Sequence, residues 1–464
     1  MGLRPTFVLV LLLVSSFHCN RAGGETADPL TQEAEEKLVA YLRIDTSNPP
    51  GNETIGANFL RDQLTKAGID AKLIGEDPKR QGVYARLEAN PKTNNKALIL
   101  ATHIDVVPAD PARWTQPPFS GARDGGYIWG RGALDVKSLT IAHLMTLLDL
   151  KRRGAKLKRD VIFLAVPDEE LGGERGAKRF LEKYPELFAN AGFALNEGGA
   201  NETAVDRVIA WGIEVHQKVP LWLRLTAEAP GGHGAGPPEG GGAPAKLVRV
   251  LSAIDQIETP YRLTPSVAHA VAAMSALGGA KADRLRAVRE PLDPARLDRE
   301  VPLRIRNLLR DTITITRLDA GSSVNVLPAK AVAEIDIRLL PGSDAAPMLN
   351  RIRELAGKNA TVDVIHAGEP SPESPASGEL YDAISKTMRE SEPGSSIYPV
   401  VGAGATDSRY FRARGIVTYG VTPFKVNYYD ADSIHGEDER IRARFLADGV
   451  LLMRDLVRSF CEAR

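Results

Sequence analysis

The sequence predicts an α/β fold with a mostly parallel central sheet, into which a smaller α+β unit is inserted. Short apolar segments that suit buried strands alternate with amphipathic helical segments in the first half of the chain. From Val215 onwards, apolar and polar residues alternate within the predicted strands, which is typical of half-exposed antiparallel sheets. After a linker rich in Pro and Ser at 370–378, the α/β pattern returns.

The α/β part is predicted segment by segment from its hydrophobic periodicity. Short apolar runs bounded by turn-forming residues indicate buried strands, and longer segments with a 3.6-residue period indicate helices. The predicted strands are 97–101, 160–166, 192–195 and 416–421. The predicted helices are 29–42, 55–66, 136–152, 173–183, 380–390 and 443–459. Strands that alternate with helices in this way form mostly parallel sheets.

The inserted part has the element order β, α, β, β, α, β. Its predicted strands and helices are, in chain order, 219–227, 245–257, 312–318, 331–339, 346–356 and 361–365. This order suggests a ferredoxin-like α+β unit. The Arg-rich segment 276–309 has helical tendency and is predicted to be a further insertion within this unit.

These patterns divide the chain into four segments. They are a signal peptide at 1–24, the α/β domain at 25–213 and 370–464, and the inserted domain at 214–369. The first segment has a positive residue, Arg4, then an apolar stretch from Phe7 to Val14, then small and polar residues. This stretch is too short to cross a bilayer comfortably. The protein is therefore expected to be exported, to a periplasm or out of the cell.

Composition excludes several classes of function. The chain of 464 residues has 59 Lys and Arg against 59 Asp and Glu, so no net charge favours nucleic acid or an acidic membrane. Its cysteines, Cys19 and Cys461, are too few for a Cys-rich metal site. Membrane attachment is expected only if Cys19 is lipidated, and the preceding 16–18 lacks the small residues of a lipobox. Any metal must be held by His and carboxylates.

Histidines and acidic residues follow the predicted strands at the point where each strand ends. His103 and Asp105 come after strand 97–101, Glu169 and Glu170 after strand 160–166, and Glu197 after strand 192–195. Asp135 opens a helix, and His435 lies in a loop after strand 416–421. Ligands of open α/β sheets bind beyond the carboxyl ends of the strands, so separate segments deliver these groups to one edge.

This set of residues favours a metal site. Crowded carboxylates repel one another, and a divalent cation removes that repulsion. His with Asp and Glu suits Zn²⁺, and also Co²⁺ or Mn²⁺, and two histidines with three carboxylates can hold two ions that share one carboxylate. Asp105 lies two residues beyond His103 on the same strand face, so it can orient that imidazole. The alternatives are a buried histidine for His103, a solvated acidic turn at 168–170 and a helix cap for Asp135.

Several motifs match one family together and in the same order. They are ATHIDVVP (101–108), WGRGALDVK (129–137), VPDEELGGERGA (166–177), LNEGG (195–199), GGHG (231–234), SSVNVLP (322–328), EIDIRLLPG (334–342), GAGATDSR (402–409) and SIHGEDER (433–440). On these motifs, which span nearly the whole mature chain, the sequence resembles the M20 metallopeptidases, which include carboxypeptidases, aminoacylases and deacetylases. The long insertion is most similar to the carboxypeptidase-S-like branch, which includes secreted hydrolases of N-acyl amino acids.

The resemblance implies a dinuclear-metal exopeptidase-like catalytic domain and a role for each matching residue. Asp135 would bridge two zinc ions, with His103 and Glu197 completing one site and Glu170 and His435 the other. Glu169 would be the general base that takes a proton from the bridging water and passes it to the leaving amine. Asp105 would orient His103.

The resemblance also makes the inserted unit a lid and dimerisation domain. His233 would reach the active site of the partner subunit in a homodimer and stabilise the oxyanion. Asn325 and Arg338 would hold the substrate, with Arg338 on its carboxylate, and Gly404 would offer a backbone N–H. The chain departs from many members at Ser138 and Leu139, where they have glycines, and in the longer Pro- and Gly-rich loop after His233.

We therefore expect metal-dependent hydrolysis of an amide bond next to a free carboxylate, in an N-acyl amino acid or a short peptide. A deacetylase or a di- or tripeptidase on the same scaffold is one alternative. A non-catalytic exported binding protein is another, although every matched ligand is present. A nucleophilic hydrolase is disfavoured because the sequence has no G-x-S-x-G.

Overall fold

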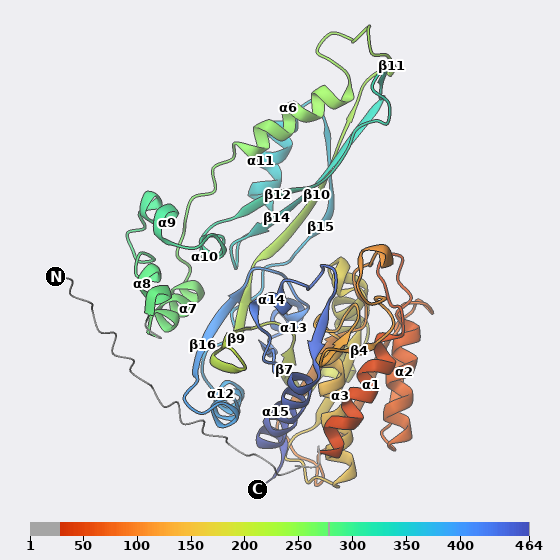
Figure 1. Cartoon of the computed structure of the whole chain (residues 1–464), viewed down its shortest axis with the longest axis vertical. Helices are drawn as coiled ribbons and strands as arrows, with labels where there is room; N and C mark the ends of the chain where they lie inside the picture. The colour runs from red at the N-terminus through yellow and green to blue at the C-terminus, as the bar shows by residue number, and fades with distance from the viewer. Residues whose placement is uncertain (1–27, 277–278, 464) are drawn as a thin grey trace, which may run out of the picture.

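The computed structural model describes residues 28–276 and 279–463. The predicted signal peptide and Cys19 lie outside the described residues. Within those residues, no helix combines the length and the apolar character needed to cross a membrane. Figure 1 shows a broad lower body that contains the chain's C-terminus, and a narrow upper part that projects from it.

The body is built on one large sheet, which among the described residues has nine strands. Its order is β1-β2-β6-β3-β7-β17-β9-β16, with β8 paired to β9. The strands are β1 (Ala71–Ile74), β2 (Gly82–Leu87), β3 (Ala97–His103), β6 (Val161–Val166), β7 (Ala191–Asn196), β8 (Ala200–Ala204), β9 (Arg207–Gln217), β16 (Ser396–Gly402) and β17 (Val417–Gly420). The central run β6-β3-β7-β17 is parallel, as the sequence predicts. Antiparallel pairs occur towards the ends, as between β1 and β2.

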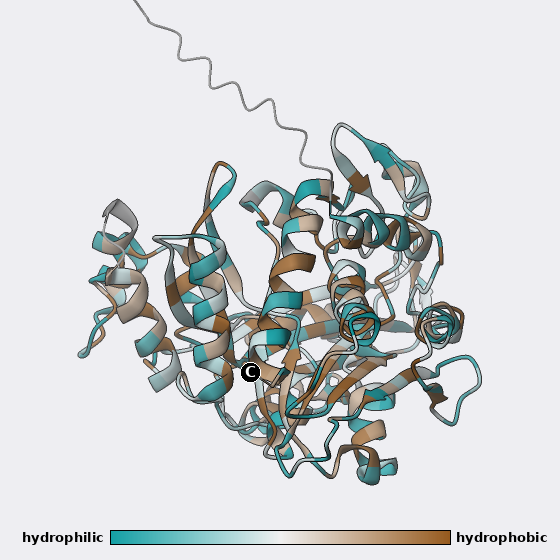
Figure 2. Cartoon of the chain, turned by 90° about the horizontal axis from the view of Figure 1, so that it is seen from below, coloured by the Kyte–Doolittle hydropathy of each residue, from teal (hydrophilic) through white to brown (hydrophobic). Residues whose placement is uncertain are grey.

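Helices cover both faces of this sheet, which is why its central strands are continuously apolar. On one face lie α1 (Pro29–Leu42), α2 (Thr54–Lys66), α3 (Lys137–Arg152), α12 (Glu379–Ser391) and α15 (Ala443–Cys461), and on the other α4 (Arg179–Lys183), α5 (Pro185–Phe188) and α13 (Ser408–Ala413). Leu98 and Leu100 of β3 belong to the first core, and Ile99 to the second. The apolar residues therefore gather between the layers (Figure 2).

One helix and several strands of the body differ from the sequence-based expectation. The helix predicted at 173–183 begins as a π-helical turn at Glu174–Lys178 and becomes regular only in α4. A Cβ on Gly176 would lie 1.8 Å from the Pro167 carbonyl oxygen, so the close approach of the strand exit sets this irregular backbone. Five strands of the large sheet were not predicted, namely β1, β2, β8, β9 and β16. β9 and β16 pair with each other in parallel at one side of the sheet.

The upper part is the inserted domain, defined here as the four-stranded sheet with its two helices. The sheet order is β12-β14-β10-β15, all pairs antiparallel. The elements are β10 (Val219–Glu228), α6 (Ala243–Asp255), β12 (Thr312–Asp319), β14 (Lys330–Leu339), α11 (Ala346–Ala356) and β15 (Thr361–Ala367). Their order confirms the ferredoxin-like prediction. A two-stranded pair, β11 (Gly232–His233) with β13 (Val326–Leu327), lies at the far tip (Figure 1).

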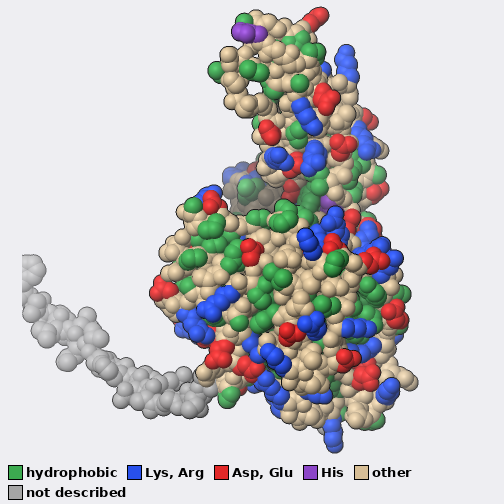
Figure 3. Space-filling model, turned by 90° about the vertical axis from the view of Figure 1, so that its right-hand side faces the viewer, with side chains coloured by type: hydrophobic (Ala, Val, Ile, Leu, Met, Phe, Trp, Pro, Cys, Tyr) green, Lys and Arg blue, Asp and Glu red, His purple; other side chains and the backbone are tan. Residues whose placement is uncertain are grey.

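The Arg-rich insertion forms helices that pack on the body. They are α7 (Pro265–Ala276), α8 (Gly279–Leu285), α9 (Pro294–Glu300) and α10 (Leu303–Arg306), and their core includes Val401 of β16. Lys218, between β9 and β10, ties this insertion to the connection. Its Nζ donates to the carbonyls of Asn307 and Arg310, each at 3.0 Å. Figure 3 shows the molecule narrowing where the inserted domain meets the body, with a hollow at that level.

Candidate dinuclear metal centre

The predicted metal ligands come from five separate segments of the body. His103 is the last residue of β3, Glu170 lies in the turn after β6, and Glu197 follows β7 directly. Asp135 precedes α3, and His435 lies between α14 (Tyr428–Ala431) and β18 (Arg440–Arg442). Because β3, β6 and β7 are parallel neighbours, their carboxyl ends meet at one edge, as the strand-end argument predicts.

The five residues form two adjoining groups that share Asp135. Ligand atoms of His103, Asp135 and Glu197 lie within 4.8 Å of one another, and so do those of Asp135, Glu170 and His435. One Asp135 oxygen lies 3.0 Å from His103 Nε2, and the other lies 3.1 Å from His435 Nε2. Glu170 Oε2 also lies 3.1 Å from His435 Nε2. Asp135 thus presents one oxygen to each group, which is the geometry of a bridging carboxylate.

The donor set fits two divalent cations. Each group offers one imidazole and two carboxylates, which is a common ligand set for Zn²⁺, Co²⁺ or Mn²⁺. Within the described part of the chain, Glu170 Oε1 is buried without a hydrogen-bond partner. A buried carboxylate oxygen is costly to leave without a partner, and a cation in this group would remove that cost.

The charged groups of the cluster shift one another's pKa values. Burial lowers the pKa of His103, but the carboxylates of Glu197, Asp105 and Asp135 outweigh burial and raise it well above its usual value. Hydrogen bonds to Asp135 and Glu170 raise the pKa of His435 to about 10. In the absence of metal, both imidazoles therefore favour their protonated, positively charged form, because they face carboxylates at short range. Cation binding would release their protons, so affinity must fall as pH falls.

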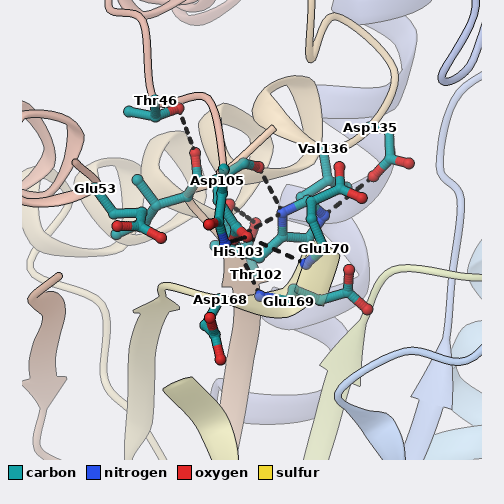
Figure 4. A network of polar contacts seen from close by, with 12 residues as sticks. Thr46, Glu53, Thr102, His103, Asp105, Asp135, Val136, Asp168, Glu169 and Glu170 are labelled. Carbon is teal, nitrogen blue, oxygen red and sulfur yellow. Dashed lines mark hydrogen bonds and ion pairs between the residues drawn. The ribbon is translucent and has the colours of Figure 1, made fainter. Parts of the chain in front are cut away.

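Asp105 is fully buried behind His103 and arranges the turn that follows β6. The backbone N–H of Glu169 donates to Asp105 Oδ1 and that of Glu170 to Oδ2, each at 3.1 Å. Asn48 Nδ2 donates to Oδ2 at 2.9 Å. His103 Nδ1 lies 2.9 Å from the Asp105 backbone oxygen and 3.7 Å from Oδ1, so main-chain and side-chain oxygens orient the ring together. Figure 4 shows Asp105 between Glu53 on one side and Glu169 and Asp135 on the other.

Glu169 is placed differently from its neighbour Glu170. It belongs to neither metal-binding group, yet it lines the same cavity as Asp135, Glu170 and Glu197. Burial and the nearby charge of Glu197 raise the pKa of Glu169 well above its usual value. A carboxylate with a raised pKa beside a metal-activated water is suited to take and return a proton.

The cavity extends from the metal-binding groups to the base of the inserted domain. Its volume is ≈ 240 Å³, and Arg338, Trp222 and Gly404 line it together with the acidic cluster. Arg338 Nε and Nη2 donate to Asp336 at 2.7 and 3.1 Å, and its guanidinium lies over the Trp222 ring. Asp336 therefore fixes one edge of the guanidinium, and the remaining Nη1 can meet a second carboxylate.

Two of the predicted substrate-contacting residues lie away from this cavity in the single chain. His233 and Asn325 are exposed at the tip of the inserted domain, at the β11–β13 pair (Figure 1). They are held together there, since the Gly234 N–H donates to the Asn325 carbonyl oxygen at 2.8 Å. The structure brings Arg338 and Gly404 to the metal cluster and keeps His233 and Asn325 as a separate pair.

Sequence reasoning gave no role to Glu439, a fully buried carboxylate that positions Asp135. Its Oε1 accepts the backbone N–H groups of Leu134 and Asp135 at 2.7 and 3.0 Å. Its Oε2 accepts the N–H of Gly132 at 2.9 Å and Arg131 Nη1 at 2.7 Å. Glu439 lies four residues after His435, so it joins the two loops that carry the bridging carboxylate and one imidazole. The motif SIHGEDER (433–440), which contains both His435 and Glu439, is the sequence signal from which this role could have been inferred.

We expect Glu439→Gln to weaken metal binding by roughly 10- to 100-fold, the usual effect of losing a group that orients a ligand. The amide nitrogen would face backbone N–H donors, so the Asp135 loop loses its acceptor and shifts. Competition titration with Zn²⁺ measures the affinity. The matched control is Glu437→Gln, an exposed residue of the same loop that pairs with Arg113. Equal affinities for the two variants would contradict the assigned role.

Comparison with known proteins agrees with this geometry. Residues 99–459 match the model of peptidase family M20/M25/M40. Aminoacylase-1 from Pongo abelii is 28% identical over 420 residues, covering 88% of this chain and 91% of the relative. The N-fatty-acyl-amino acid synthase/hydrolase PM20D1 from Xenopus tropicalis is 30% identical over 363 residues, covering 74% and 68%. The solved M20 family metallo-carboxypeptidase Sso-CP2 from Sulfolobus solfataricus superposes with a TM-score of 0.73 at 19% identity, covering 92% and 99%.

The chain therefore belongs to the M20/M25/M40 peptidase family. It is a hydrolase that acts on C–N bonds and depends on metal, and its body carries the two groups that could hold metal ions at the carboxyl edge of the large sheet.

Proposed function

We propose that the protein is a dizinc amidohydrolase that releases an amino acid with a free carboxylate from an N-acyl amino acid or a short peptide. One observation carries the proposal: Arg338 and members of both metal-binding groups line one cavity. A substrate whose carboxylate pairs with Arg338 would have its amide bond beside Glu169. Arg suits this task because its planar guanidinium binds carboxylates with defined geometry.

The residues of the chain divide the reaction between them. Two cations held by the His103, Asp135 and Glu197 group and the Asp135, Glu170 and His435 group would polarise the scissile carbonyl and acidify a water molecule. Glu169 accepts the proton of that water and returns it to the nitrogen of the leaving amine. Arg338 holds the carboxylate and so aligns the amide bond. Asp105 keeps the backbone of Glu169 and Glu170 in place.

Arg338→Ala is expected to lower kcat/KM for substrates with a free carboxylate by about 100-fold, since the substrate charge loses its partner. Substrates with an amidated carboxyl group should be hydrolysed equally poorly by both enzymes. The matched control is Arg224→Ala on the neighbouring strand β10. Arg224 also pairs with a carboxylate, that of Glu334, but it does not line the cavity. If Arg338→Ala still preferred substrates with a free carboxylate over substrates with an amidated carboxyl group, Arg338 would not be the residue that recognises the carboxylate.

We propose Zn²⁺ as the native metal because His and carboxylates in groups of three suit it. Metal analysis of protein purified without added metal tests this choice. Two zinc ions per chain would support it, whereas a predominance of cobalt or manganese would replace it.

The proposal also includes a homodimer and export. His233 and Asn325 lie at the tip of the inserted domain, away from the metal-binding groups of their own chain. In a homodimer they would complete the active site of the partner subunit. Sedimentation measures the dimer, and mixing His233→Ala with Glu169→Gln subunits tests whether activity is restored through complementary sites. Sequencing the N-terminus of secreted protein tests removal of residues 1–24.

A deacetylase or di- or tripeptidase would use the same metal centre with a different substrate. A panel of acetylated amino acids, longer N-acyl amino acids, dipeptides and tripeptides, compared by kcat/KM, ranks these activities. Preference for unblocked dipeptides over every N-acyl amino acid would overturn the proposed substrate class.

A further inference from the structure

We propose that Glu214 is a positioning residue, which fixes the backbone next to the metal ligand Glu197 and thereby sets the affinity of one of the two metal sites. The inference rests on the proposed dinuclear centre and adds a residue that none of the sequence motifs contains. Glu214 lies on β9 and is 3% exposed. Burying a carboxylate is costly, so its surroundings must compensate for the lost water.

Glu214 and Glu197 are brought together by the strand that lies between theirs. Gly420 of β17 pairs with Asn196 of β7 on one side and with Glu214 of β9 on the other. A Cβ on Gly420 would lie 2.9 Å from the Glu214 Cβ and 2.6 Å from the Glu197 carbonyl oxygen. Because Gly420 has no side chain, Glu214 extends across β17 to the backbone that carries the metal ligand.

The Glu214 carboxylate lies between two loops of the active site. A Cβ on Gly198 would lie 2.6 Å from Glu214 Oε2, and a Cβ on Gly402 would lie 2.5 Å from the same oxygen. Gly198 directly follows Glu197, and Gly402 ends β16 before the loop that brings Gly404 to the wall of the metal cavity. Glu214 therefore packs directly against the backbone of both loops and fixes the distance between them.

Arg412, which is buried on α13, holds the Glu214 side chain. Its Nη2 lies 3.6 Å from Glu214 Oε1, and its Nη1 donates to Gln217 Oε1 at 3.4 Å. Its Nε donates to the carbonyl oxygen of Thr418 at 3.2 Å. Burial raises the pKa of Glu214 to about 7; Arg412 opposes this rise, and the charge of Glu197 adds to it. The carboxylate of Glu197 thus acts on Glu214, and a cation bound by Glu197 would relieve their repulsion.

The place of Glu214 connects it to one metal site and not to the other. Glu197 belongs only to the group with His103. Glu439, in contrast, positions Asp135, which belongs to both groups. A change at Glu214 therefore displaces the ligand of a single site, and the selective weakening of one metal ion distinguishes this role from a general loss of stability.

The test is competition titration of the full-length metal-free protein with Zn²⁺, for wild type and Glu214→Gln. Gln keeps the shape of Glu but lacks the charge that pairs with Arg412. We expect the affinity of one zinc site to fall roughly 10- to 100-fold, the usual effect of losing a group that orients a ligand, while the other stays within about threefold. Equal losses at both sites, or no loss, would overturn the inference. If wild type binds fewer than two ions, the proposed dinuclear centre itself fails.

A double-mutant comparison identifies the site that weakens. Glu197→Gln removes the ligand through which Glu214 acts, so adding Glu214→Gln to it should cause no further loss of zinc affinity. A further loss of tenfold or more in the double variant would show that Glu214 acts on the other site.

A matched control and a second variant separate this role from stability. Glu392→Gln removes another buried carboxylate, which pairs with Lys425 and belongs to neither metal-binding group. We expect it to lower the melting temperature and to leave both zinc affinities unchanged. Should Glu214→Gln fail to fold because Arg412 is left unpaired, Glu214→Gln combined with Arg412→Met removes both charges and should show the same selective loss. Wild-type affinity at both sites of that folded variant would overturn the inference.

Discussion

Glu169→Gln is expected to lower kcat by roughly 10³- to 10⁴-fold while both metals remain bound, because general acid–base catalysis contributes on that scale. Gln has nearly the shape of Glu but cannot accept the proton of the attacking water. Glu169 lines the cavity and belongs to neither metal-binding group, so the ligand sets survive the change. Steady-state kinetics and metal analysis of the same preparation measure the two properties separately.

The control for this variant is Glu174→Gln. Glu174 lies five residues further along the chain, lines the neighbouring cavity with Leu171 and Arg175, and belongs to neither metal-binding group. We expect it to keep kcat within a few-fold. Residual activity above about 10% of wild type in Glu169→Gln would assign the proton transfer to another group, since such a loss is below the usual contribution of a general base.

Asp135→Asn is expected to weaken binding of both metals at once, by more than the roughly 100-fold that the loss of an orienting partner causes. One Asp135 oxygen faces each group, so a single substitution damages both sites. Asn keeps one neutral oxygen and turns an NH₂ group towards one imidazole. Stoichiometry by metal analysis and affinity by competition titration are the measurements.

The alternative expectation is stepwise loss. If Asp135 served only one site, the variant would keep one tightly bound ion, and the stoichiometry would fall from two to one. Glu197→Gln provides that comparison, because Glu197 belongs only to the group with His103. The exposed Asp124→Asn, on β4 (Ala122–Asp124), controls for general effects of removing a carboxylate near this segment.

Much of the body was predictable from local sequence. Helices α1, α3 and α15 lie within two residues of their predicted bounds. α1 and α15 keep an amphipathic period of 3.6 residues, whereas α3 is long and apolar and is buried along almost its whole length. The carboxyl ends of β3, β6 and β7 were also predictable, and so was the position of His103, Glu170 and Glu197 at those ends. The arrangement of α4 was not, since the π-helical turn before it depends on a contact between Gly176 and Pro167, which lie nine residues apart.

Other features depended on contacts between distant segments. Glu437, Asp438 and Glu439 are three consecutive acids, and sequence alone does not separate them. In the fold, only the third carboxylate meets the N–H groups of the Asp135 loop, while Glu437 is exposed.

The sequence by itself determined the class of chemistry, because a chain with two cysteines must hold any metal with His and carboxylates, and several of these follow strand ends that meet at one edge of the sheet. His103, Asp135 and His435 were therefore identifiable as residue types at particular places. Tertiary structure decided which oxygen faces which imidazole and which acid positions the bridging loop. These properties are distances and surfaces between segments, and they exist only once the segments have packed together.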